Sequence, residues 1–216
     1  HIHTGEGGLL LTNNDDLADR MQLIRNHAEV VVADKSYSSL VNMLGHNFRL
    51  GEIECAIGIE QLKKLPSLVS SRQAIAQLLL EGLSDLEGLI LPTTQPDCTH
   101  SYYVFAMRLN LNILNTDRAW IVKALAAEGV RCSAGYQNIH LLPLYQEKIA
   151  YGSSGFPWSS DICHREISYM KGICPTAEKL HEETYFGFGL CKYSLSTSDI
   201  EKIIQAFHKV WAHIDI

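Results

Sequence analysis

The first eight residues of the chain combine glycines with side chains that can bind ligands or carry protons. Gly5, Gly7 and Gly8 permit positive φ angles, which let a backbone approach a ligand closely. An apolar segment at 8–12 follows at once and is predicted to form a β-strand. The pattern indicates either a ligand-binding loop that opens a strand or a plain tight turn, since glycine marks turns of every kind.

Histidine and cysteine are numerous, but their spacing does not favour a metal site. The chain has ten histidines and six cysteines. His1 and His3 are the only close histidine pair, and Cys163–His164 lacks a second pair at the spacing of a zinc site. We therefore expect no metal, and we expect cysteines that are reduced and mostly buried.

The bulk properties are those of an ordinary globular chain. It has 216 residues, of which 46% are hydrophobic and 19% charged, enough for one large domain or two small ones. The formal net charge of −6 argues against nucleic acid as a partner, because surfaces that bind nucleic acid are basic. No apolar run approaches the ~20 residues that span a bilayer, and no secretory signal is recognisable. We therefore expect a cytoplasmic protein without nucleic-acid or membrane partners.

The first third of the chain is expected to be largely helical. Asn13–Asp16 supplies cap-forming and acidic side chains for the start of a helix. Pro66 is expected to separate two further helices. The predicted elements are, in order, a helix at 15–26, an irregular or extended segment at 30–39, a loop at 45–49 and helices at 50–64 and 67–83.

The rest of the chain has a mixed pattern of helices and strands. Gly129 stands where a helix ends, Pro175 where one begins, and Ser196 with Asp199 has the spacing of a capping box. The predicted strands are 89–91, 102–109, 130–134 and 185–193, and the predicted helices are 117–126, 140–150 and those that start at 175 and 196. This order favours a small α+β domain whose last helix packs on the core.

Four segments, taken in order, resemble the DegT/StrS family of sugar aminotransferases. The segments are His1–Gly8 (HIHTGEGG), Leu23–His27 (LIRNH), Gly45–Gly58 with the motifs GHNFR and EIECAIG, and His100–Phe105 (HSYYVF). The resemblance implies an α/β protein of the fold-type-I aminotransferase architecture. Residues 1–64 would end the large domain, whose mixed sheet binds pyridoxal 5′-phosphate (PLP), and 65–216 would form the linking helix and the small α+β C-terminal domain.

The resemblance also implies the chemistry. The family transfers an amino group from an amino acid such as glutamate to a keto-sugar, usually nucleotide-linked, in the biosynthesis of amino sugars and cell-surface polysaccharides. In the family, the lysine that forms a Schiff base with PLP directly precedes the segment that matches His1–Gly8. We therefore expect the catalytic lysine immediately upstream of His1, outside these residues.

Asn47 and Arg49 match a G-x-N-x-R loop of the family. In relatives this loop reaches across a homodimer interface to the PLP phosphate of the neighbouring subunit. An amide donor and a guanidinium suit a phosphate dianion. The resemblance thus implies a homodimer with shared active sites, and a surface loop with a structural arginine is the alternative.

Tyr136 and His140 fall where relatives carry an H-Y-x-P-L-H segment that contacts the sugar-nucleotide substrate. Gly135 and Asn138 replace the first histidine and the proline of that segment, so the identity of the sugar is open. His100 opens a predicted strand and is a third candidate for substrate binding. Packing or solvent-exposed roles are the alternative for each of these side chains.

Two other functions stay open at the level of the sequence. A PLP-dependent sugar dehydratase on the same fold has histidine in place of the lysine, and the glycine-rich opening segment does not separate the two enzymes. A non-catalytic relative that serves in dimerisation or regulation is the third possibility. The residue before His1 discriminates among them.

Overall fold

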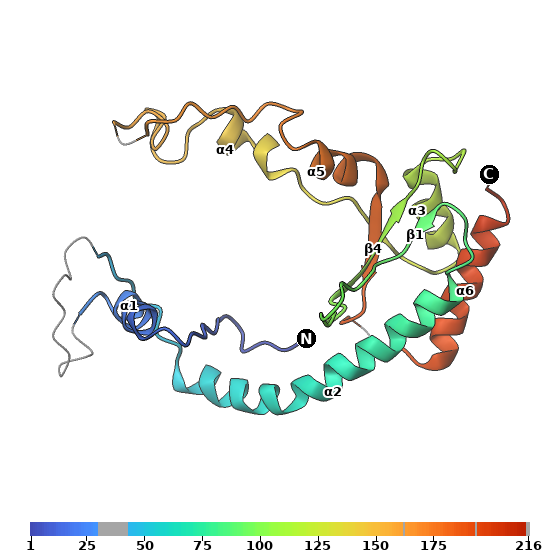
Figure 1. Ribbon diagram of the computed structural model, residues 1–216, viewed down its shortest axis with the longest axis horizontal. Helices are drawn as coiled ribbons and strands as arrows, with labels where there is room; N and C mark the ends of the chain where they lie inside the picture. Colours follow the sequence, from blue (N-terminus) through green and yellow to red (C-terminus); the bar gives the residue numbers. More distant parts are fainter. Residues whose placement is uncertain (30–42, 162, 193, 215–216) are drawn as a thin grey trace. The chain divides into compact units, whose positions relative to one another are not determined.

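The computed structural model describes residues 1–29, 43–161, 163–192 and 194–214 (Figure 1). Its contacts divide the chain into two units, His1–Leu68 and Val69–Ile216. Each unit is described by itself. Among the described residues, no helix is long and apolar enough to cross a membrane.

The first unit contains the helix α1, Asp15–Arg25, as predicted. The Asn14 side chain caps it by accepting a hydrogen bond from the Leu17 N–H at 3.0 Å. Asp15 and Asp16 lie in the first turn, where acidic groups complement the helix dipole. The expected irregular segment at 30–39 lies outside the described residues.

The predicted strand at 8–12 is not formed in the described structure. Leu9, Leu10 and Leu11 are 71%, 74% and 84% exposed, and this segment has no secondary structure. A β-strand needs a hydrogen-bonded neighbouring strand, and no described residue forms a strand pairing or bridge with residues 8–12. The apolar character of a segment cannot reveal whether a pairing partner is present.

The helix α2, Glu52–Gly82, is continuous over 31 residues, so the prediction of two helices is wrong (Figure 1). Pro66 lies inside it. A proline removes one backbone donor, and here the helix continues on both sides of that loss. Ser67 does not cap a new helix, because its hydroxyl donates to the Lys64 carbonyl at 2.8 Å within the same helix.

The second unit is built on a four-stranded antiparallel sheet. Its strands are β1 Leu89–Ile90, β2 Val104–Leu109, β3 Ser133–Ala134 and β4 Tyr185–Gly189, in the order β1-β2-β4-β3. Side chains along β2 alternate between a buried face and a more exposed one. The four predicted strands are therefore confirmed, each shorter than expected.

Two long helices of this unit begin at the predicted caps. In α3, Arg118–Ala127, Asp117 accepts from the Trp120 N–H, and α6, Thr197–Trp211, starts with the Ser196–Asp199 capping box. The two helices contact one another beside the sheet (Figure 1). The core that they form with the sheet and the second half of α2 includes Leu79, Leu83, Phe105, Met107, Ile121, Leu125, Phe186, Phe207 and Trp211.

Shorter elements connect β3 to β4. They are the 3₁₀ turn η1 Ile139–Leu141, the helix α4 Pro143–Gln146, the helix α5 Pro175–Lys179 and the π-helical turn η2 Leu180–Thr184. The start of α5 at Pro175 is confirmed. The helix expected at 140–150 is much shorter, because Lys148 adopts a left-handed φ of 54°, which no α-helix can include.

The expectation that the cysteines are mostly buried is wrong. Four are half-buried and two, Cys98 and Cys174, are exposed. Most of the six lie in loops or turns, where general burial preferences of the residue type do not apply. Among the described residues, no group of three or more His, Cys, Asp or Glu side chains could hold a metal ion.

Candidate functional site

In the first unit, the segment after α1 pairs with the predicted loop at 45–49. The His46 N–H donates to the Ile24 carbonyl at 2.7 Å, the His27 N–H donates to the His46 carbonyl at 3.0 Å, and the Phe48 N–H donates to the Arg25 carbonyl at 2.9 Å. These bonds bring together two motifs that lie about twenty residues apart in the sequence. They fix the backbone on which Arg49 is carried.

Arg49 and Asn47 form an exposed donor cluster with the end of α1. The Arg49 guanidinium donates to Oδ1 of Asn26, and its Nη2 lies 3.3 Å from Nε2 of His27. Asn47 pairs with Asn26 through a backbone bridge, and both predicted side chains are exposed. A guanidinium has five N–H donors in a fixed fork, so these contacts leave donors for an anion.

Sequence reasoning did not assign a site role to Asn26 or His27. The segment Leu23–His27 matches a family motif, but only the structure shows that the side chains of its last two residues contact Arg49. Asn47 and Arg49 as phosphate ligands stay a prediction.

In the second unit, the loop Gly135–His140 is anchored at its start by Gly135. The Gly135 N–H donates to the Tyr185 carbonyl at 2.9 Å, and its φ is 70°. A Cβ at this position would lie 2.5 Å from the His181 carbonyl oxygen. The loop therefore requires glycine here, both for its backbone conformation and for the close approach to the η2 turn.

The same loop is anchored at its end by a hydrogen bond between two side chains. Nε2 of His140 lies 2.8 Å from Oε1 of Glu178, and the two side chains are 10% and 7% exposed. The Glu178 carboxylate also accepts from the N–H groups of Gly172 at 2.8 Å and Cys174 at 3.2 Å. Burial raises the pKa of Glu178, but the hydrogen bonds from Gly172, His140 and Cys174 outweigh it and hold this pKa below its usual value.

Tyr136 projects between these two anchors. Its side chain is 78% exposed, so it is accessible to a ligand. Burial, and to a lesser extent the neighbouring Tyr136 phenol, raises the pKa of Tyr185. Tyr136 and His140 therefore lie in one loop, the first open to solvent and the second enclosed, and their role in substrate binding stays a prediction.

His100 is engaged in local contacts. Its Nδ1 accepts from the Tyr102 N–H at 2.8 Å, and the two rings stack with centroids 4.1 Å apart. The His100 carbonyl accepts from the Gln73 amide at 3.1 Å. These contacts support the start of β2, and among the described residues none of them joins His100 to the Tyr136 loop.

Glu178 and Arg118 were not identified from the sequence. The Arg118 guanidinium donates to four backbone carbonyls around η2, those of Leu180, His181, Glu182 and Tyr185, at 2.8–3.2 Å. Burial lowers the pKa of Arg118. The partners of Arg118 lie more than sixty residues away along the chain, so no local pattern could have indicated this role.

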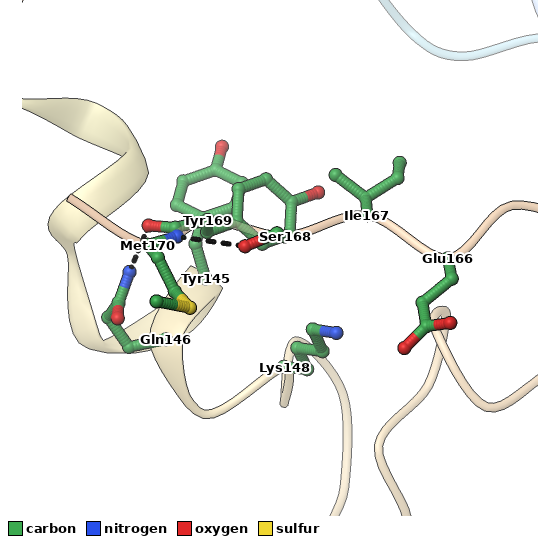
Figure 2. Close-up of a pocket in the computed structure, with 8 residues that line it drawn as sticks. All are labelled: Tyr145, Gln146, Lys148, Glu166, Ile167, Ser168, Tyr169 and Met170. Atoms are coloured by element: carbon green, nitrogen blue, oxygen red, sulfur yellow. Dashed lines mark hydrogen bonds between the residues drawn. The ribbon is translucent and has the colours of Figure 1, made fainter. Parts of the chain in front are cut away.

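A pocket of about 430 Å³ abuts the loop (Figure 2). Tyr145 and Tyr169 lie side by side on its wall, with ring centroids 5.1 Å apart. The Gln146 amide donates to the carbonyls of both His140 and Tyr169 at 2.7 Å, which ties the pocket wall to the loop. The pocket is lined by Tyr145, Gln146, Lys148, Glu166, Ile167, Ser168, Tyr169 and Met170.

The chain is similar in sequence to curated proteins. The chain is 30% identical over 174 residues to an uncharacterized protein of Methanocaldococcus jannaschii, covering 78% of this chain and 45% of that protein. It is 29% identical over 169 residues to the UDP-4-amino-4,6-dideoxy-N-acetyl-beta-L-altrosamine transaminase of Helicobacter pylori, covering 77% and 43%. The chain thus spans less than half the length of these curated relatives.

A solved structure supports the same fold. S. venezuelae DesV, whose structure holds a ketimine intermediate, superposes with a TM-score of 0.68 at 23% identity, over 95% of this chain and 47% of that one. The similarity confirms the fold-type-I architecture. The model of the DegT/DnrJ/EryC1/StrS aminotransferase family matches residues 1–184. The chain therefore belongs to the DegT/DnrJ/EryC1/StrS aminotransferase family.

Proposed function

We propose that this protein transfers the amino group of an amino acid such as glutamate to a keto-sugar that is linked to a nucleotide. The observation that carries the proposal is the exposed donor cluster of Asn47 and Arg49 in a chain of an aminotransferase family. The H. pylori relative is named for the transamination of a UDP-linked sugar. The product would serve amino-sugar and polysaccharide biosynthesis in the cytoplasm.

The donor set of the first unit suits PLP. A phosphate dianion calls for several N–H donors and a positive charge, and Asn47 and Arg49 offer both from an exposed loop. PLP supplies the electron sink through which an amino group leaves one substrate and joins the other. Asn47 and Arg49 would hold its phosphate in the site of the neighbouring subunit, so the active unit is a homodimer.

The loop of the second unit is assigned to the sugar substrate. Tyr136 offers an exposed hydroxyl, and His140 offers an imidazole that is fixed by Glu178. His100 is the third residue assigned to this side of the reaction. In this proposal residues 1–64 complete the PLP-binding domain and 65–216 form the linking helix and the small domain.

The test uses the full-length protein with PLP. We expect a visible absorbance band of protein-bound PLP that disappears when glutamate is added, with one 2-oxoglutarate formed per site. Arg49→Ala should weaken PLP binding, whereas Arg20→Ala, a change of an exposed arginine on α1, should not. Absence of the band in wild-type protein saturated with PLP would refute the proposal.

A sugar dehydratase is the second candidate, because it shares the fold and the opening segment. The two functions differ in the residue before His1, which is lysine in the transaminase and histidine in the dehydratase. Reading that residue in the gene, together with the response to glutamate, separates them.

A further inference from the structure

The loop Gly135–His140 is held at both ends by the same stretch of chain. Its start is bonded to the backbone of Tyr185, and its end is bonded to Glu178 on α5. Tyr136 lies between these anchors and is exposed. The position of Tyr136 is therefore set by contacts that it does not make itself.

Glu178 differs from the other acidic side chains of this stretch. It is 6% exposed, whereas Glu182 and Glu183 are exposed. A buried carboxylate is unfavourable unless hydrogen bonds replace its hydration. Glu178 has three such donors, the N–H groups of Gly172 and Cys174 just before α5 and Nε2 of His140 in η1. The carboxylate thus joins the loop before α5, the cap of α5 and the η1 turn.

The Glu178 carboxylate also determines which ring nitrogen of His140 carries a proton. An ionised carboxylate only accepts hydrogen bonds, so Nε2 of His140 must carry the proton that is donated to Oε1 of Glu178. The ring is then fixed in orientation, and its Nδ1 is the nitrogen left for other contacts. The backbone of His140 is held as well, because its carbonyl accepts from Gln146.

We propose that Glu178 is a positioning residue for the sugar substrate, acting through His140 on the loop that carries Tyr136. The inference rests on the proposed function. It assigns to Glu178 no contact with substrate or cofactor. Its effect is confined to the half-reaction in which the keto-sugar binds, and the half-reaction with the amino donor does not depend on it.

The decisive variant is Glu178→Gln in the full-length PLP-loaded protein. The amide NH₂ would face a donor in either orientation: Gly172 N–H at one oxygen position, or Cys174 N–H and His140 Nε2 at the other. We expect the KM for the keto-sugar to rise about tenfold, which corresponds to the loss of one hydrogen bond to a charged group. The single-turnover rate with glutamate should stay within about twofold of wild type. Glu183→Gln is the matched control, and it should change neither.

Binding is measured separately from turnover. UDP-, GDP- and dTDP-linked keto-sugars are titrated calorimetrically into wild type without amino donor, and the one that binds is used for all variants. Its dissociation constant should rise about tenfold in Glu178→Gln. His140→Ala should weaken binding at least as much, and the double variant should be no weaker than His140→Ala alone, because both changes remove one interaction.

The outcomes separate the two proposals. If wild type neither reacts with glutamate nor transaminates a keto-sugar, the proposed function fails. If wild type is active and Glu178→Gln leaves KM and affinity unchanged, or slows the glutamate half-reaction equally, the positioning role is overturned. Additive losses in the double variant would also overturn it, because Glu178 would then act independently of His140. Should Glu178→Gln not fold, His140→Ala alone decides: no change in keto-sugar affinity overturns the inference.

Discussion

Gly135 has a role that depends on the absence of a side chain. We expect Gly135→Ala to destabilise the protein by about 1–3 kcal/mol from its left-handed φ, and by more because the new Cβ would meet the His181 carbonyl. Urea denaturation measures the loss. Gly152→Ala is the control, because Gly152 has a φ of 66° but no atom within 4 Å of the added Cβ. Equal losses in both variants would contradict the steric argument and leave only backbone strain.

Glu178 should contribute to the pH dependence of protein stability in acid. Its pKa is lower in the folded state than in the unfolded chain, so its contribution to stability is fully present above the unfolded value of about 4.3. That contribution is lost as the pH falls through the lower folded pKa. We expect the wild-type urea midpoint to decline over this acid range and Glu178→Gln to lack that part of the decline. A variant curve parallel to wild type would show that the carboxylate does not titrate as described.

Some residues of the candidate site could be predicted from the sequence, and others could not. Tyr136 and His140 could be selected because they match a family segment. Glu178 could not, because its importance arises from donors at Gly172, Cys174 and His140, which only the fold brings together. The sequence alone does not distinguish a buried glutamate from an exposed one.

Among the elements, η2 depends on a side chain from α3. Arg118 donates to three carbonyls of this π-helical turn and to that of Tyr185, which follows it, and the backbone of the turn lacks a regular α-helical pattern. Lysine keeps the charge but has no planar fork, so Arg118→Lys should cost about 1–3 kcal/mol. Urea denaturation measures the loss in the free energy of unfolding. Amide hydrogen exchange at 180–185 should accelerate more than exchange in the rest of the unit. Arg131→Lys, a change of an exposed arginine between α3 and β3, is the control. Uniform acceleration across the unit would contradict a local role.

Elements were predicted well where their signals are local. The caps at Asn14, Asp117 and Ser196 each began the expected helix, because capping involves residues three or four positions apart. The predictions failed where the structure of a segment depends on more than its neighbours in the sequence. The segment 8–12 has strand-like residues but no described pairing neighbour, and α2 continues through Pro66 although proline usually ends a helix.

For the whole molecule, the proposal of shared active sites has a direct consequence. If Arg49 serves the site of the neighbouring subunit, a heterodimer of Arg49→Ala with a variant of the lysine expected before His1 has both defects in the same site. One of the two sites then contains both defects, and the other contains none. Two inactive proteins should therefore regain activity when they are mixed and allowed to exchange subunits.

Random exchange gives a quantitative expectation. Half of the dimers are then mixed and each has one intact site of two, so activity should reach roughly a quarter of the wild-type value. Tagged subunits and size-exclusion chromatography establish that heterodimers have formed. If they form and activity stays absent, Arg49 acts on the cofactor of its own subunit. If the protein is monomeric at assay concentration yet active, the sites are not shared, and the proposed role of Asn47 and Arg49 in the neighbouring subunit is wrong.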